Sequence, residues 1–198
     1  MPFRPALIIH GGAGSLPDPS RRKQIKQHLS KVAEAAYQFL RHHSALEGVV
    51  YAVRLLEDDP LFNAGTGSVL QRDGAARMSA SVMDGHTCRF GAVLNIEGVR
   101  NPIMVARALL DEPDRVLAGT GARRFARSLG YGPWKAVTAQ RLRQWKARRL
   151  GTSGTVGAVA LDRDGRLASA TSTGGKGYER VGRVSDSGMP VANYADAH

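Results

Sequence analysis

The sequence contains one cysteine, no long apolar run and, over one stretch, no acidic residue. The lone Cys88 excludes an internal disulfide, which suits a reducing compartment such as the cytoplasm. One cysteine and scattered histidines also give no zinc-ligand spacing. No window approaches the roughly 20 apolar residues that a membrane-spanning helix needs, and residues 1–5 carry no signal-peptide pattern. We therefore expect a cytoplasmic protein with no membrane partner.

Acidic residues are missing between Ala122 and Leu150, where nine arginine or lysine residues occur. This stretch contributes to a formal net charge of +11. One interpretation is a nucleic-acid interface that contacts phosphates. The other is a solvated, mobile linker. Because no recognised nucleic-acid motif accompanies the charge, we favour a mobile linker over residues 122–154 and expect nucleic acid not to be a partner.

What is present fits a single domain over residues 1–198, long enough to bury a sizeable core. Asp18 can cap a first helix, and Ser44 with Glu47 forms a capping-box pattern for a second. The order of helices and strands predicts an α/β fold with layers of sheet covered by helices. We expect strands within residues 6–14, 76–83, 89–94, 156–162 and 166–173. Two further helices are expected at residues 101–113 and 116–130.

Thr155 starts a predicted strand in "GTSGTVGAVALD", directly behind Gly154. If the bond between them were cut, the new α-amine would sit on the same residue as the hydroxyl. An α-amine has a pKa near 7.7–8.0, so an appreciable fraction is a neutral base at pH 7. Gly154 lacks a Cβ, so its carbonyl can be approached closely. The alternative is a plain strand that begins with threonine, and the spacing alone favours that alternative.

Motifs along the chain favour the nucleophile. The stretch "GTVGAVALDRDGRLASATSTGG" with the later "GRVSDS" resembles the plant-type asparaginase and isoaspartyl peptidase family of N-terminal nucleophile hydrolases. "IIHGGAG", "LLEDDPLFNAGTGSVL" and "MDG" resemble the same family upstream, in the right order. The resemblance covers essentially the whole chain. It implies a four-layer αββα sandwich of two facing sheets covered by helices, here incomplete at the C-terminus, with an α segment 1–154 and the start of a β segment 155–198.

The resemblance also implies the catalytic residues. Thr155 matches the nucleophile that cleavage after Gly154 would uncover. Thr173 matches the threonine beside the nucleophile, and its hydroxyl could hydrogen-bond Thr155. Asn63 matches an asparagine near the nucleophile.

Two further residues match the substrate clamp of the family. Arg183 matches the arginine that binds the substrate α-carboxylate, a bidentate task that suits a planar guanidinium. Asp186 matches the carboxylate that holds the substrate α-ammonium. The alternative is a surface ion pair between positions i and i+3, which stabilises little.

The segment "LLEDDPLFNAGTG" resembles the sodium-binding loop of the family. A turning loop can offer several backbone carbonyls to a hard cation. We expect a structural sodium ion and no organic cofactor; a helix-terminating loop without an ion is the alternative. The positions that match the carbonyl ligands are Leu56, Glu57, Asp59, Phe62, Ala64 and Thr66.

The expected enzyme is an L-asparaginase and β-aspartyl (isoaspartyl) peptidase that cleaves itself. Its substrates would be the small molecules asparagine and β-aspartyl dipeptides, and the resemblance implies a homodimer of αβ units. Ser185 and Ser79 depart from the family pattern, and the family continues beyond the position of His198 with a Thr-Gly-containing segment. We therefore expect a truncated or shortened member.

Two other functions stay open at this stage. One is a glycosylasparaginase-like hydrolase, although an aspartate usually precedes the threonine in that relative, where Gly154 stands here. The other is an inactive remnant or basic binding fragment.

Overall fold

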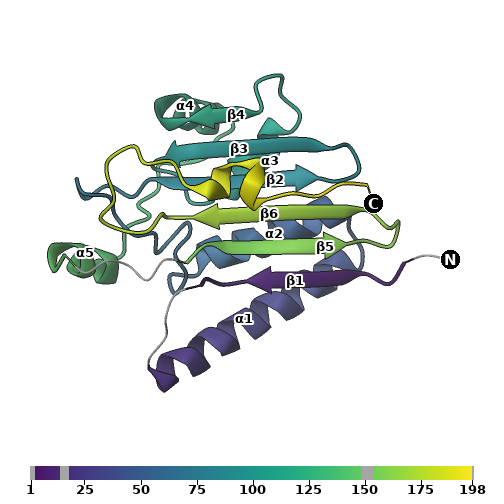
Figure 1. Ribbon diagram of the computed structural model, residues 1–198, viewed down its shortest axis with the longest axis horizontal. Coiled ribbons are helices and arrows are strands. Elements are labelled where there is room, and N and C mark those ends of the chain that lie inside the picture. Colours follow the sequence, from purple (N-terminus) through teal and green to yellow (C-terminus); the bar gives the residue numbers. More distant parts are fainter. Residues whose placement is uncertain (1–2, 14–17, 149–153, 198) are drawn as a thin grey trace.

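A computed structural model describes residues 3–13, 18–148 and 154–197. Its described part is a mixed α/β fold around one six-stranded sheet with the strand order β1-β5-β6-β2-β3-β4 (Figure 1). Neighbouring strands are antiparallel except β3 and β4, which are parallel. The strands are β1 (Ala6–His10), β2 (Met78–Asp84), β3 (Arg89–Ile96), β4 (Val116–Ala118), β5 (Val156–Leu161) and β6 (Leu167–Thr173).

Helices α1, α2 and α3 cover one face of this sheet, and two short 3₁₀ turns lie on the other (Figure 1). Helix α2 packs on β5 and β6, and α3 on β2 and β3. No helix among the described residues is long and apolar enough to cross a membrane. The elements are α1 (Pro19–Leu40), α2 (Ala45–Asp58), α3 (Pro102–Leu109), α4 (Gly119–Ser128), α5 (Ala139–Lys146), and the turns η1 (Asp186–Gly188) and η2 (Pro190–Ala192).

Both predicted helix caps are confirmed. The Asp18 side chain accepts the Ser20 amide at the start of α1. At the start of α2, Ser44 and Glu47 satisfy each other's backbone amides in a capping box, which pairs two donors that a helix start otherwise leaves free. The capped helices present apolar stripes to the sheet, and the core forms between the two layers. Its fully buried side chains include Leu40, Val49, Val53, Leu56, Met78, Val82, Ile96 and Ile103.

The hairpin of β5 and β6 carries the residues of greatest interest. Val156 pairs with Ser172 and Leu161 with Leu167, as the alternation of the sequence predicted. Gly165 in the connecting turn has φ +78°, a conformation that favours glycine. The hairpin lies between β1 on one side and β2 on the other, so β5 and β6 are central strands.

Two expectations need correction. Residues 116–130 begin as strand β4 and become helical only at Gly119. The proposed linker 122–154 is not a free segment over its described part: residues 122–148 contain α5 and most of α4, with Ala126, Ala136 and Arg141 buried; its residues 149–153 lie outside the described residues. The expected α/β fold is confirmed, because residues 3–13, 18–148 and 154–197 build one sheet with its helical layer, which is consistent with the helix-covered sheets of the expected sandwich.

Candidate active site

The start of β5 is held by the glycine-rich turn that follows β1. His10 Nδ1 lies 2.8 Å from the carbonyl oxygen of Thr155, so the ring donates its Nδ1–H to that oxygen. Gly12 has φ +128°, and a Cβ there would lie 3.1 Å from Gly154 Cα. Glycine is therefore needed at position 12 for its backbone conformation and for the close approach of Gly154. The "HGG" motif thus packs directly against the predicted cleavage point.

The Thr155 hydroxyl is half-buried and lies 3.3 Å from the hydroxyl of Ser187. Thr173 lies on the neighbouring strand β6. Val156 pairs with Ser172, so extending this antiparallel register by one residue places Thr173 opposite Thr155. The expected hydrogen bond between the two threonines is not formed in the described structure. Thr173 Oγ1 instead accepts the Gly175 amide at 3.1 Å, because the chain turns directly after β6. The two residues are thus neighbours without a direct hydrogen bond.

Asn63 also lies next to Gly154. A Cβ on Gly154 would lie 3.8 Å from Asn63 Cβ, so the two residues are close neighbours. The buried Asn63 amide nitrogen donates to the Gly175 carbonyl at 2.6 Å, and its side-chain oxygen accepts the Val69 amide at 2.9 Å. All the polar atoms of this side chain therefore serve to fix the loop and the turn after β6.

Arg183 and Asp186 precede and begin η1. The surface ion pair considered as an alternative is not formed between them. Within the described residues the Arg183 guanidinium makes no hydrogen bond or ion pair, and the exposed Asp186 carboxylate accepts only the amide of Ser187, at 3.0 Å. Both charged groups therefore keep most of their bonding capacity.

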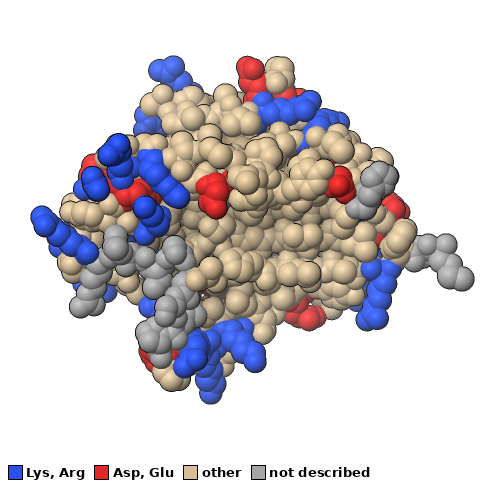
Figure 2. All heavy atoms as spheres, in the orientation of Figure 1, with Lys and Arg blue, Asp and Glu red and all other residues tan. Residues whose placement is uncertain are grey.

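An open hollow of about 360 Å³ lies beside Thr155 on the sheet face that α1 and α2 leave uncovered. His10, Thr155, Thr171 and Asn193 supply polar lining, and exposed apolar side chains such as Ile8 and Val159 complete it. Figure 2 shows this face as largely uncharged at its centre, with Lys and Arg gathered toward its edges. Arg183 and Asp186 do not line the hollow in this structure.

Glu57 carries a fully buried carboxyl between α2, α3 and β6. Its Oε1 accepts the Ser172 hydroxyl at 2.6 Å and the Ile103 amide at 3.1 Å, and Oε2 has no hydrogen-bond partner. Burial raises the pKa of Glu57 from 4.5 to about 8, because a carboxylate loses its hydration there, and the hydrogen bond from Ser172 opposes the rise. The group is therefore protonated at neutral pH.

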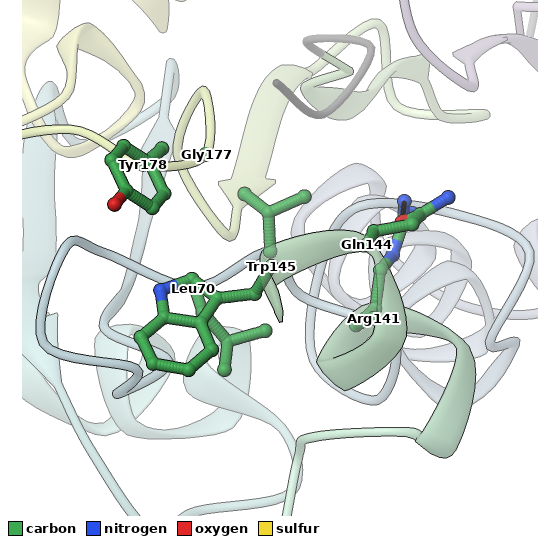
Figure 3. Close-up of a pocket in the computed structure, with 7 residues that line it drawn as sticks. Leu70, Arg141, Gln144, Trp145, Gly177 and Tyr178 are labelled. Atoms are coloured by element: carbon green, nitrogen blue, oxygen red, sulfur yellow. Dashed lines mark hydrogen bonds between the residues drawn. The ribbon is translucent and has the colours of Figure 1, made fainter. Parts of the chain in front are cut away.

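Helix α5 packs on the loop that follows Asn63. The Arg141 guanidinium, 4% exposed, donates from Nε to the Gly67 carbonyl at 2.6 Å, and Trp145 Nε1 donates to the Gln71 carbonyl at 2.8 Å. Figure 3 shows Arg141, Gln144 and Trp145 of this helix lining a small pocket with Leu70, Gly177 and Tyr178. Burial lowers the pKa of Arg141, and Arg21 adds to the effect. The basic stretch thus supports the Asn63 loop.

Sequence reasoning missed three contacts of this site. The motif "IIHGGAG" did not indicate that the His10 ring binds the Thr155 carbonyl. Ser187 follows Asp186 directly in "GRVSDS", and that position beside the clamp was the one signal that pointed to it. The sequence carried no signal for the Glu57 side chain, because its burial depends on segments that are distant in the sequence.

Comparisons with known proteins match the sequence of this chain to one family. The family model described as asparaginase matches residues 3–153 and 148–198. An isoaspartyl peptidase/L-asparaginase from Nostoc is 47% identical over 98% of this chain and 69% of its own length. The Synechocystis protein of the same description is 44% identical over 96% of this chain and 64% of its own, and a plant-type L-asparaginase from Pyrococcus horikoshii is 39% identical over 91% and 67%.

The chain spans about two thirds of the length of these relatives. The match runs through the motifs that surround Gly154 and Thr155, and it covers the glycine-rich turn and the Asn63 loop as well. The chain therefore belongs to the asparaginase family of isoaspartyl peptidases and plant-type L-asparaginases.

Proposed function

We propose that this chain is an autoprocessing threonine amidohydrolase. It hydrolyses L-asparagine to aspartate and ammonia and cleaves β-aspartyl (isoaspartyl) dipeptides. The observation that carries the proposal is the convergence on Gly154 and Thr155 of the "HGG" turn, the Asn63 loop and η1. Family membership supports it, since the relatives carry the names isoaspartyl peptidase and L-asparaginase.

The first reaction is cleavage of the chain. Thr155 Oγ attacks the carbonyl carbon of Gly154, the C–N bond breaks, and the Thr155 nitrogen takes the proton that the hydroxyl gives up. The product is an ester between Gly154 and the Thr155 hydroxyl. Water then hydrolyses this ester and leaves a carboxylate on Gly154 and a free α-amine on Thr155.

The second reaction uses the same hydroxyl. The neutral α-amine of Thr155 takes the hydroxyl proton while Oγ attacks the side-chain amide of the substrate, and ammonia or the peptide amine leaves with that proton. Water hydrolyses the β-aspartyl ester. Arg183 binds the substrate α-carboxylate and Asp186 its α-ammonium, a role supported by the free bonding capacity of both groups. Thr173 and Asn63 support the nucleophile from β6 and from the loop.

A structural sodium ion suits the loop that begins at Leu56. Its donors are backbone carbonyl oxygens, which are hard ligands for a hard cation. Gly65 and Gly67 have positive φ, and a Cβ at Gly67 would lie 2.6 Å from the Pro60 carbonyl oxygen and 2.8 Å from that of Phe62, so both carbonyl oxygens of this tight loop lie against Gly67. The proposed ligands are the carbonyls of Leu56, Glu57, Asp59, Phe62, Ala64 and Thr66. The ion would fix the loop and takes no part in the reaction.

The sandwich of two facing sheets and the homodimer of αβ units remain proposals. Exposed apolar side chains on the uncovered sheet face, such as Ile8 and Val159, support a further layer there. Light scattering of the purified protein measures the oligomeric state, and a mass of one αβ unit would contradict the dimer.

Intact-mass analysis of the purified chain tests the proposed function. Two fragments meeting between Gly154 and Thr155 are expected, together with ammonia release from asparagine and aspartate release from β-aspartyl dipeptides. Thr155→Ala should stay uncut and inactive while it still unfolds in one cooperative thermal transition. A wild-type chain that hydrolyses β-aspartyl peptides while it stays intact would contradict the autocleavage mechanism, and a cut chain without hydrolysis would contradict the activity.

A further inference from the structure

The hydroxyl of Ser187 is the single hydrogen-bond partner of the Thr155 hydroxyl among the described residues. Ser187 is fully buried at the centre of η1, and the two oxygens lie 3.3 Å apart. Thr173, the neighbour that the family resemblance pointed to, does not hydrogen-bond to that hydroxyl in the described structure, and its own hydroxyl oxygen accepts the Gly175 amide. Ser187 is thus the group that contacts the proposed nucleophilic atom.

The backbone of Ser187 is fixed independently of its hydroxyl. Its carbonyl oxygen accepts the Ser81 hydroxyl at 2.8 Å and the Thr171 hydroxyl at 2.9 Å, so β2 and β6 both hold it. Ser81 is itself held by the Asn193 amide at 3.0 Å. The Ser187 hydroxyl has no hydrogen bond other than that to Thr155 within the described chain. Removing this hydroxyl therefore deletes one contact and leaves the supports of η1 in place.

We propose that Ser187 is a positioning residue for the Thr155 nucleophile, an inference that rests on the proposed function. The side chain of a threonine is β-branched, and its methyl and hydroxyl exchange places when χ1 changes. The contact with Ser187 selects the Thr155 rotamer that turns the hydroxyl toward η1. It also orients the hydroxyl group, because either a lone pair or the hydrogen of Oγ must point at the Ser187 hydroxyl. A nucleophile held in one orientation reacts faster, because less freedom is lost on reaching the transition state.

Ser187 contacts the nucleophile with its side chain and Asp186 with its backbone. A substitution of the side chain therefore affects the nucleophile alone, whereas a general defect of the loop would affect both. Its amide donates to Asp186 Oδ1 at 3.0 Å, so the backbone of Ser187 orients the proposed ammonium-binding carboxylate, while its side chain orients the nucleophile. Loss of the hydroxyl leaves the amide contact unchanged. The rate of each Thr155 reaction should therefore fall while the KM for asparagine stays near the wild-type value.

The test compares Ser187→Ala with Ser185→Ala. Ser185 is a buried serine two residues earlier whose hydroxyl has no partner, so it controls for a lost hydroxyl in the same loop. Since a hydrogen bond contributes about 0.5–1.5 kcal/mol, Ser187→Ala should slow cleavage at Gly154–Thr155 and lower kcat about three- to tenfold. We expect KM within about twofold of wild type, and Ser185→Ala should match wild type in both rates.

Other outcomes are equally informative. A Ser187→Ala protein that cuts and turns over at wild-type rates would overturn the inference and leave the proposed function standing, whereas an uncut and inactive wild type would overturn the proposed function itself. An equal loss in Ser185→Ala, or a loss carried by KM, would assign the effect to loop packing and also overturn the inference. If Ser187→Ala does not fold, Ser187→Cys keeps the size with a weaker donor, and rates between wild type and one tenth of it are expected; wild-type rates would overturn the inference.

Discussion

The two faces of strand β6 carry similar hydroxyl residues in very different surroundings. Ser172 points toward the helices and donates to the fully buried carboxyl of Glu57. Thr171 points to the opposite face, where its hydroxyl donates to the Ser187 carbonyl beside the open hollow. Successive side chains of a strand alternate between faces, so one residue step separates a dry polar pair from the proposed reaction site. The sequence "TST" alone does not show which of these hydroxyl groups is buried. The helices on one face of the sheet and the open hollow on the other determine it.

The largest expected effect is a pH dependence of the unfolding free energy, which arises from Glu57 on the helix-covered face. Burial raises the pKa of Glu57 to about 8, while in the unfolded chain the group ionises near 4.5. The folded protein thus binds one more proton between these values, and its stability falls as pH rises through that window. Relative to Glu57→Gln, wild type should lose on the order of 4 kcal/mol of unfolding free energy from pH 5 to pH 8, measured by urea denaturation.

Glu47 on the same helix is the matched control with the opposite sign. Hydrogen bonds from the Ser44 side chain and amide lower the pKa of Glu47. The stabilising contribution of Glu47 to the unfolding free energy is present above pH 4.5, and it is lost as the pH falls through the lowered pKa of Glu47. Glu47→Gln should therefore leave the slope between pH 5 and pH 8 unchanged. If Glu57→Gln has the wild-type slope as well, Glu57 does not carry a raised pKa.

A smaller effect is expected from Ser172→Ala. The substitution leaves Glu57 Oε1 with the Ile103 amide as its one remaining donor, so a buried acceptor loses half of its hydrogen bonds. We expect a loss of about 2 kcal/mol of unfolding free energy at pH 6. The pKa of Glu57 should also rise further, because the Ser172 hydrogen bond lowers it. A loss below about 0.5 kcal/mol would show that the pair contributes little.

The smallest effect is expected from Thr171→Val on the opposite face. The Ser187 carbonyl keeps the Ser81 hydroxyl as a donor, and Thr171 is only partly buried. We expect a loss of about 0.5 kcal/mol in thermal or urea unfolding. A larger loss than in Ser172→Ala would reverse the comparison between the two faces of β6.

Local chemistry explains what could be predicted from the sequence. Asp18 and the Ser44–Glu47 box predicted helix starts, because capping depends on residues within one turn. The hairpin of β5 and β6 followed from alternation and a glycine turn. The family motifs pointed to Thr155, Asn63, Arg183 and Asp186 as site residues, and their roles remain predictions.

Contacts between distant segments explain what could not be predicted. Glu57 stands in "LLEDDP" beside two other acidic residues, and only the packing of α2 on β6 makes it the buried one. Arg141 and Arg143 look alike in a basic stretch, yet Arg141 donates to the carbonyl of Gly67, 74 positions away. Ser187 reaches Thr155 because η1 folds back over the sheet, which no local pattern encodes.

The position of the hairpin within the sheet has a consequence for any cut at Gly154–Thr155. Strands β5 and β6 follow that bond, yet they lie between β1 and β2, which precede it, and they pair with both. The cut would convert one chain into two interleaved polypeptides, joined by two ladders of backbone hydrogen bonds and a shared core. Dilution should not separate this heterodimer, and fragments made apart would have to thread into each other. Assembly is therefore simplest while the bond is still whole.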